Sequence, residues 1–214
     1  MKCDVIIPVG PGHEGVKDRA AASVSIACSQ GVGPFDDVRI KMVDDMEGQM
    51  GRSGARNLAV NDSDAGWLFF LDADDLMHPD AFSCLNNVSD FDELYGLWGQ
   101  IIEYHDGCYL ERYQVPVIEG YHELLKHDVY LTLQMGHFVQ REAALSTPFD
   151  EGMDTGEDWD YYLRLWREYR CAKRRGAYMV NCRAQHSVGP RSATGSDWRE
   201  AVSGLIENAR EMAA

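Results

Sequence analysis

Three acidic residues stand directly after a short apolar run about a third of the way along the chain. Residues 67–75 read WLFFLDADD, so Asp72, Asp74 and Asp75 follow side chains that belong in a core. Magnesium and manganese ions prefer oxygen ligands, and they combine one or two carboxylates with phosphate oxygens. A solvated turn that caps the next helix gives the same pattern. The D-x-D spacing alone therefore leaves a metal site and an acidic turn both open.

The second half of the chain also holds residues that could transfer a proton or bind a metal ion. Glu157 and Asp158 open an expected helix, where the helix dipole stabilises each acid by about 0.3 to 1 kcal/mol. A carboxylate held in a pocket can instead act as a general base that takes a proton from a hydroxyl. His186 lies in an expected loop with Arg183 and Arg191. Imidazole binds manganese-like ions and guanidinium groups suit phosphate oxygens, whereas an ordinary surface loop is the alternative.

Alternating strand and helix patterns predict an α/β layer architecture that would position these residues. Strands are expected at 3–9, 38–43, 66–71 and 177–182, and a hairpin is expected around Asp106-Gly107. Helices are expected at about 14–29, after a cap at Ser53, from Pro79, after a capping box at Thr155, and at about 197–212. In an open, mostly parallel sheet, ligands bind beyond the carboxyl ends of the strands. Asp44-Asp45 and the DADD segment both follow strands, so both fall where a site is expected.

The composition narrows the class of protein. The 214 residues include 20 Lys and Arg and 35 Asp and Glu, which gives a formal charge of −15, and 45% of them are hydrophobic. One folded domain is expected, and a non-specific nucleic-acid binder is disfavoured because the net charge repels phosphate. The six cysteines lack a C-x-x-C pair, and the longest apolar run is far shorter than the ~20 residues that span a bilayer. We expect reduced thiols and a cytoplasmic protein without integral membrane association.

Six segments in order resemble the family-2 nucleotide-sugar glycosyltransferases of GT-A fold. They read DVIIPVG, VRIKMVDD, GRSGARNLAV, WLFFLDADDLMHPDAF, FDEGMDTGEDWDYYLRLW and QHS, between Asp4 and Ser187. The resemblance implies a single GT-A-like, Rossmann-related α/β domain over 1–214, with a mostly parallel central sheet flanked by helices and a small antiparallel β-ribbon. It divides the chain into a nucleotide-sugar-binding half (1–94), an acceptor-binding and catalytic half (95–190) and a C-terminal helix (191–214).

The resemblance also assigns residues to the donor. Pro8 and Val9 would line the nucleotide base, and Asp45 would hydrogen-bond it. Arg56 would lie near the donor, and Asp72 would approach the sugar or the ribose.

The remaining assignments concern the metal and the reaction. Asp74 would bind a Mn²⁺ or Mg²⁺ ion that bridges the two phosphates, and His186 resembles a late histidine that completes the metal site. Asp158 matches the catalytic base, and Glu157 would contact the acceptor. From the residues themselves, Trp98, Tyr104, His105 and Tyr109, on or near the expected hairpin, are further candidates for acceptor contacts.

These assignments predict a metal-dependent, inverting glycosyltransferase. It would move a sugar from a nucleoside-diphosphate sugar, first of all a UDP-sugar, to the hydroxyl of an acceptor. A sugar nucleotidyltransferase is one alternative, although GPGHEG after the first strand lacks the adjacent cations that a triphosphate needs. A non-catalytic module that binds nucleotide sugars or metal is the other alternative.

Overall fold

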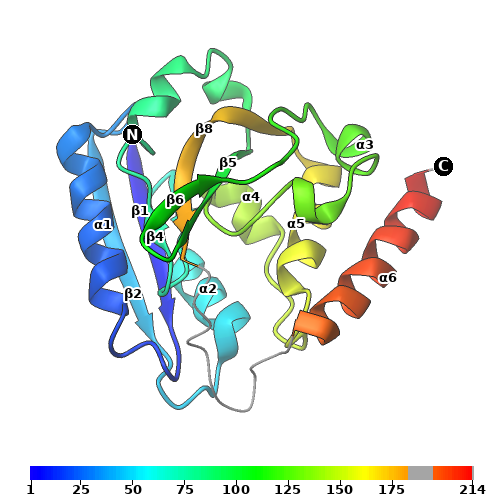
Figure 1. Ribbon diagram of the computed structural model, residues 1–214, viewed down its shortest axis with the longest axis horizontal. Coiled ribbons are helices and arrows are strands. Elements are labelled where there is room, and N and C mark those ends of the chain that lie inside the picture. Colours follow the sequence, from blue (N-terminus) through cyan, green and yellow to red (C-terminus); the bar gives the residue numbers. More distant parts are fainter. Residues whose placement is uncertain (183–194, 214) are drawn as a thin grey trace.

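The computed structural model describes residues 1–182 and 195–213, in which the strands form an eight-stranded sheet flanked by helices (Figure 1). The strands are β1 (Lys2–Val9), β2 (Asp37–Asp44), β3 (Trp67–Phe70), β4 (Leu76–Met77), β5 (Gly96–His105), β6 (Cys108–Glu111), β7 (His137–Gln140) and β8 (Cys171–Asn181). The α-helices are α1 (Lys17–Gln30), α2 (Gly51–Asp62), α3 (Tyr121–Leu124), α4 (Arg141–Ser146), α5 (Glu157–Glu168) and α6 (Gly195–Ala213). Short 3₁₀ helices lie at η1 (Ser83–Asn87), η2 (Phe91–Glu93) and η3 (Val129–Leu131).

The sheet is mixed, which corrects the prediction of a mostly parallel one. The strand order is β2-β1-β3-β7-β5-β8-β4, and β6 pairs with β5. Strand β1 is parallel to β2 and β3, and β5 is parallel to β8, but β7 lies antiparallel between β3 and β5. Strand β7 has four residues, too few for a hydrophobic period to show in the sequence. Because of β7, neighbouring strands at the centre of the sheet run in opposite directions.

Alternating side chains of the central strands build one core on each face of the sheet. Ile6 of β1 and Phe70 of β3 pack in the core that includes residues of α2, α4, α5 and α6. Val5 and Phe69, one position earlier, pack in the core that includes residues of α1. Since successive residues of a strand point to opposite faces, buried runs such as WLFF supply both cores.

Three expected helix starts differ from the structure. Ser53 lies inside α2 rather than at its cap, and Thr155 lies outside α5, whose N-cap is Gly156. The segment after Pro79 forms the 3₁₀ helix η1 and no α-helix. In each case the sequence holds a residue type that favours helix starts, and the structure places no α-helix start at that residue.

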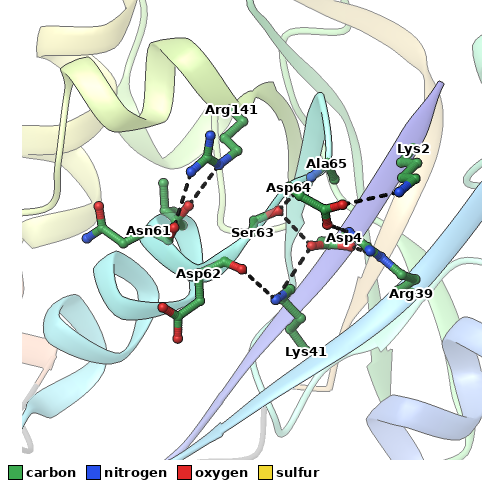
Figure 2. A network of polar contacts seen from close by, with 11 residues as sticks. Lys2, Asp4, Arg39, Lys41, Asn61, Asp62, Ser63, Asp64, Ala65 and Arg141 are labelled. Carbon is green, nitrogen blue, oxygen red and sulfur yellow. Dashed lines mark hydrogen bonds and ion pairs between the residues drawn. The ribbon is translucent and has the colours of Figure 1, made fainter.

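A polar network fixes the N-terminal end of β1, as Figure 2 shows. Buried Asp4 accepts hydrogen bonds from Nε of Arg39 at 2.7 Å and from Oγ of Ser63 at 2.6 Å. Arg141, the first residue of α4, donates to the backbone oxygens of Val60 at 3.0 Å and Asn61 at 3.2 Å. These oxygens belong to the last turn of α2 and have no partner within the helix. The network therefore joins β1, β2, α2 and α4.

The structure confirms the hairpin at Asp106-Gly107, which joins β5 to β6. Both turn residues have positive φ angles, 49° and 82°, as a type I′ hairpin turn requires. All six cysteines are free thiols. Among the described residues, every helix is too short or too polar to cross a lipid bilayer.

Candidate active site

A cleft at the C-terminal ends of β1, β2 and β3 gathers the predicted site residues that the structure describes. Its volume is about 290 Å³, close to the lower end of the ~300 to 1,000 Å³ usual for small-molecule sites. Its walls include Pro8, Val9, Asp45, Arg56, Asp72, Asp74, Glu157 and Asp158. The ninth predicted residue, His186, lies outside the described residues. Residues more than a hundred positions apart therefore face one cavity.

Asp45 caps helix α2. Its Oδ1 accepts hydrogen bonds from the backbone N–H groups of Gln49 at 2.8 Å and Met50 at 3.2 Å, and its Oδ2 accepts one from Gly51 at 2.7 Å. These amides belong to the first turn of α2 and the residues before it, where N–H groups lack helical partners. A carboxylate has about four lone-pair positions, so Asp45 still has room for a ligand N–H. The contact with a nucleotide base expected for Asp45 stays a prediction.

A chain of ion pairs crosses the cleft between α2 and α5. Arg56, 2% exposed, places Nη2 2.6 Å from Oδ1 of Asp72 and Nη1 3.5 Å from Oε1 of Glu157. Nε of Arg52 lies 2.5 Å from the same Glu157 oxygen. Burial alone would lower the pKa of Arg56, but the charges of Asp72 and Glu157 raise it. Two guanidinium groups thus stand at the cleft, and carboxylates hold both in place.

The three acids of the DADD segment have different surroundings. Asp75 is buried and accepts hydrogen bonds from the backbone N–H of Cys182 at 2.8 Å and from Nδ2 of Asn181 at 3.3 Å. Burial, followed by the charge of Asp72, raises the pKa of Asp75 well above its usual range. Asp72 and Asp74 line the cleft instead. Asp75 therefore connects the loop to the end of β8, while Asp72 and Asp74 face the cleft.

His13 is a cleft residue that the sequence analysis missed. Its Nδ1 accepts a hydrogen bond from the backbone N–H of Gly10 at 3.1 Å, so a neutral imidazole carries its proton on Nε2. Nε2 lies 4.0 Å from Oδ2 of Asp74. The only signal in the sequence is the position of His13 in the glycine-rich loop after the first strand.

The described residues fit a metal ion only with help from a ligand. Within 1–182 and 195–213, no three His, Cys, Asp or Glu side chains are grouped as a metal site. Magnesium is commonly held by one or two carboxylates and completed by substrate phosphates and water. Asp74 fits that pattern, because it lines a cleft with room for further oxygen ligands.

Asp158 stands at the start of α5, where α6 covers it. Gly156 precedes α5 with φ of 76°, and a Cβ at this position would lie 3.3 Å from Cβ of Ala201 in α6. This close approach brings Trp198 of α6 to Asp158, and the indole Nε1 donates to Oδ1 at 3.3 Å. Figure 1 shows α6 beside α5. The sequence analysis missed Trp198, because it treated the last helix only as an amphipathic element.

The environment of Asp158 favours its protonated form. Burial, followed by the charge of Glu157, raises the pKa of Asp158 to about 7, while the N–H groups of Trp159 and Trp198 act in the opposite direction. A carboxyl group with a pKa near neutrality is suited to take and release a proton at neutral pH. The cleft therefore combines the Asp158 carboxyl group, whose pKa is raised, two guanidinium groups paired with carboxylates, and the acids Asp72 and Asp74.

A sequence model described as glycosyl transferase family 2 matches residues 20–175, well over half of the chain. The chain belongs to glycosyl transferase family 2. This assignment to an enzyme family confirms the resemblance noted from the sequence. No curated protein matches the family 2 chain.

Solved structures show the same fold as this family 2 chain. The S. aureus TarS 1–349 chain aligns with a TM-score of 0.66 at 13% identity, and its complex with UDP-GlcNAc aligns with a TM-score of 0.68 at 16% identity. Both alignments cover 98% of this chain but only 65% and 66% of the TarS chains. In another S. aureus TarS structure, 39% of the chain is covered. The likeness confirms the GT-A-like α/β fold, and the family 2 chain spans no more than about two thirds of these relatives.

The prediction that Trp98 contacts the acceptor is wrong. It is 1% exposed and stacks on His137, with ring centroids 4.2 Å apart and planes 8° apart. A side chain enclosed in this way contributes to the core of the family 2 domain and cannot touch a ligand. Tyr104, His105 and Tyr109 lie on the β5–β6 hairpin, and their contact with an acceptor stays a prediction.

Proposed function

We propose that this family 2 protein transfers a sugar from a nucleoside-diphosphate sugar to an acceptor hydroxyl, with inversion at the anomeric carbon. The observation that carries the proposal is Asp158, whose pKa of about 7 suits a general base and which faces the cleft beside Arg52 and Arg56. A UDP-sugar is the first candidate, since structures of the similarly folded TarS include complexes with UDP-GlcNAc and with UDP.

The donor is proposed to lie along the C-terminal ends of β1, β2 and β3. Pro8, Val9 and Asp45 would contact the base, and Asp72 would contact the ribose or the sugar. The N-terminus of α2 carries partial positive charge, which suits a diphosphate. A Mg²⁺ or Mn²⁺ ion held by Asp74, and by His186 outside the described residues, would add positive charge that stabilises the departing diphosphate. The chain has a net charge of −15, so an anionic ligand needs such compensation.

The proposed reaction is a single displacement. Asp158 takes the proton of the acceptor hydroxyl, and the acceptor oxygen forms a bond to the anomeric carbon. The bond from that carbon to the diphosphate oxygen breaks, and the nucleoside diphosphate leaves with its electron pair. Arg52 and Arg56 hold Glu157 beside Asp158, and the charge of Glu157 helps keep the pKa of Asp158 high.

Replacement of the base tests this function. Asp158→Asn keeps the shape of the side chain but removes the proton acceptor, so we expect transfer to fall by ~10² to 10⁴ while nucleotide binding remains. Initial rates of sugar transfer from a panel of nucleotide sugars, and the Kd for UDP with Mn²⁺, are measured on the same samples. Asp160→Asn is the matched control and should keep the parental transfer rate. Asp160 lies on the same helix and forms an ion pair with Arg164, four residues later.

Two results would remove the proposal. Parental transfer rates in Asp158→Asn would exclude Asp158 as the base. Binding of a nucleotide sugar by the parent without any transfer or hydrolysis would favour the non-catalytic module.

A further inference from the structure

The chain segment between α4 and α5 leads directly to Asp158 and contains neither helix nor strand. It covers residues 147–156, and α5 then begins with Glu157 and Asp158. Since no regular backbone hydrogen bonding fixes the path of this segment, its contacts with neighbouring elements decide where α5 begins. The position of Asp158 in the cleft depends on those contacts.

Asn57 of α2 binds the backbone of this segment at Phe149. Its Nδ2 donates to the carbonyl oxygen of Phe149 at 2.9 Å, and its Oδ1 accepts a hydrogen bond from the N–H of Phe149 at 2.9 Å. Nδ2 also donates to Oε1 of Glu151 at 2.9 Å. A side-chain amide holds a donor and an acceptor in one plane, so it can pair with both polar groups of one residue. Asn57 therefore fixes the backbone at Phe149 in position and in orientation.

The ring of Phe149 joins the segment to α5. It is 3% exposed and stacks on Tyr161 of α5, with ring centroids 4.0 Å apart and planes 18° apart. The guanidinium carbon of Arg56 lies 5.2 Å from the centroid of the Phe149 ring on the side of α2. Packing of a buried aromatic ring restricts the backbone that carries it. Asn57 thus acts on a residue that packs against the helix of Asp158.

Arg52 holds a later part of the same segment. Its Nη2 donates to the carbonyl oxygen of Asp154 at 2.5 Å, and its Nε lies 2.5 Å from Oε1 of Glu157. Arg52 also lines the donor cleft, so its replacement would alter ligand binding together with the segment. Asn57 lies outside the described walls of the cleft. It is therefore the residue of α2 at which the position of Asp158 can be changed separately.

We propose that Asn57 is a positioning residue for the sugar transfer and that it acts through Asp158. The inference rests on the proposed function, because it gives Asn57 a role in the same reaction. By holding the backbone of Phe149, Asn57 fixes the point at which α5 begins, and this point sets the distance from Asp158 to a hydroxyl in the cleft. A misplacement of about 1 Å can lower a reaction rate about 100-fold. Loss of Asn57 should therefore affect the reaction more than the binding of the donor.

Replacement of Asn57 by leucine tests the proposal by transfer kinetics. Asn57→Leu keeps the branched shape of the side chain and removes its hydrogen bonds to Phe149 and Glu151. We expect kcat to fall by ~10 to 100-fold, while KM for the nucleotide sugar and the Kd for UDP with Mn²⁺ equal the parental values. Both are measured below the melting temperature of each variant. A purely structural role would lower the melting temperature and leave kcat of the folded protein unchanged.

Asn57→Asp is a second, milder variant. Its carboxylate still accepts a hydrogen bond from the N–H of Phe149, but it has no donor for the carbonyl oxygen of Phe149 or for Glu151. It also brings a second negative charge next to Glu151. We expect the same changes as in Asn57→Leu, so the proposal is tested even if the leucine variant does not fold.

The indole N–H of Trp198 reports the position of Asp158 without a transfer reaction. It donates to Oδ1 of Asp158 at 3.3 Å. The chain has five tryptophans, and the Trp198 indole signal in a ¹H–¹⁵N NMR spectrum is assigned by its loss in Trp198→Phe. In both Asn57 variants this signal should shift, because its acceptor has moved.

Asn61→Leu is the matched control. Asn61 lies one turn later on α2, and its Nδ2 donates to the carbonyl oxygen of Asn57 at 3.0 Å within the same helix. Its kcat, KM and Trp198 signal should equal the parental values. An unchanged Trp198 signal in the Asn57 variants would overturn the proposal, as would a kcat equal to that of Asn61→Leu. A parent that binds UDP but transfers no sugar would contradict the proposed function alone, and the Trp198 signal then decides separately whether Asn57 positions Asp158.

Discussion

At the scale of single residues, Asp158 depends on a partner from the far end of the chain. The indole of Trp198 donates to its Oδ1, a contact that favours the charged form and lowers a pKa that burial and Glu157 raise. A general base must lose its proton before it accepts another. Transfer should therefore increase as the pH rises through about 7, the pKa of Asp158 in the protein without ligands.

Loss of the indole donor should move this pH dependence. In Trp198→Phe the carboxylate of Asp158 loses a hydrogen bond, its pKa rises further, and the rising limb of kcat/KM moves to higher pH. The measurement is kcat/KM from pH 5.5 to 9 with Mn²⁺ present. Trp166→Phe, a change on α5 outside the cleft, is the control and should keep the parental profile. If the pH dependence of kcat/KM in Trp198→Phe equals that of the parent, Trp198 has no influence on the pKa of Asp158.

Asp74 is the residue on which metal-dependent donor binding should depend. A ligand at ~100 times its Kd adds about 2.7 kcal/mol of stability, which raises the melting temperature of a chain of this size by ~5 to 10 °C. With a nucleotide sugar, the part of this shift that requires Mn²⁺ should disappear in Asp74→Ala. Asp80→Ala changes an exposed acid of the same region and should retain it. A full Mn²⁺-dependent shift in Asp74→Ala would remove Asp74 from the metal site.

At the scale of elements, hydrogen bonds to Asp45 fix the position at which α2 begins. The helix has no side-chain cap at Met50, and three N–H groups from Gln49 to Gly51 donate to Asp45 from the loop after β2. The cap thus attaches α2 to the end of β2, and α2 carries both Arg52 and Arg56. A carboxylate predicted as a ligand contact also positions the cations of the cleft.

Removal of this cap should cost stability. Asp45→Ala leaves the three N–H groups without their acceptor, and we expect the free energy of unfolding to fall by about 1 to 2 kcal/mol. Urea unfolding measures the change. Asp44→Ala, which breaks only the exposed pair with Lys17, should cost ~0.2 to 1 kcal/mol at most. Equal losses in the two variants would contradict the capping role.

At the scale of the whole molecule, one end of β1 contributes to stability and the other end lines the cleft. The first residues of β1 enter the network of Asp4, Arg39 and Ser63, and the last ones, Pro8 and Val9, line the donor cleft. Asp4 and Pro8 lie four positions apart on the extended strand β1, so we expect a change in the network to alter stability without altering ligand binding.

Asp4→Ala tests this separation. Two hydrogen bonds are lost, one of them to a guanidinium group, and such bonds contribute about 1.5 to 3 kcal/mol. We expect the free energy of unfolding to fall by about 2 to 3 kcal/mol, with the Kd for UDP unchanged below the melting temperature. Asp36→Ala, an exposed acid paired with the N-terminus of the chain, should alter neither quantity appreciably. A weaker Kd in Asp4→Ala would show that the two ends are coupled.

The sequence by itself determined the features that depend on neighbours along the chain. The buried runs of β1 and β3 predict strands, the acids after β2 and β3 fall at strand ends, and Asp106-Gly107 predicts the hairpin turn. Short-range sterics and hydrophobic period are sufficient for these features. Hence eight of the nine predicted site residues share one cleft.

Only the tertiary structure decided which element lies against which. The insertion of β7 into the sheet, the inward turn of Asp75 toward Cys182 and the contact of Trp198 with Asp158 join residues far apart in the chain. A hydrophobic period shows that a face is buried, but it does not show what covers it. The elements that pack on a carboxylate determine its burial, the charges near it and its hydrogen-bond partners. These three factors set its pKa and therefore its role, and they arise from the folded chain as a whole.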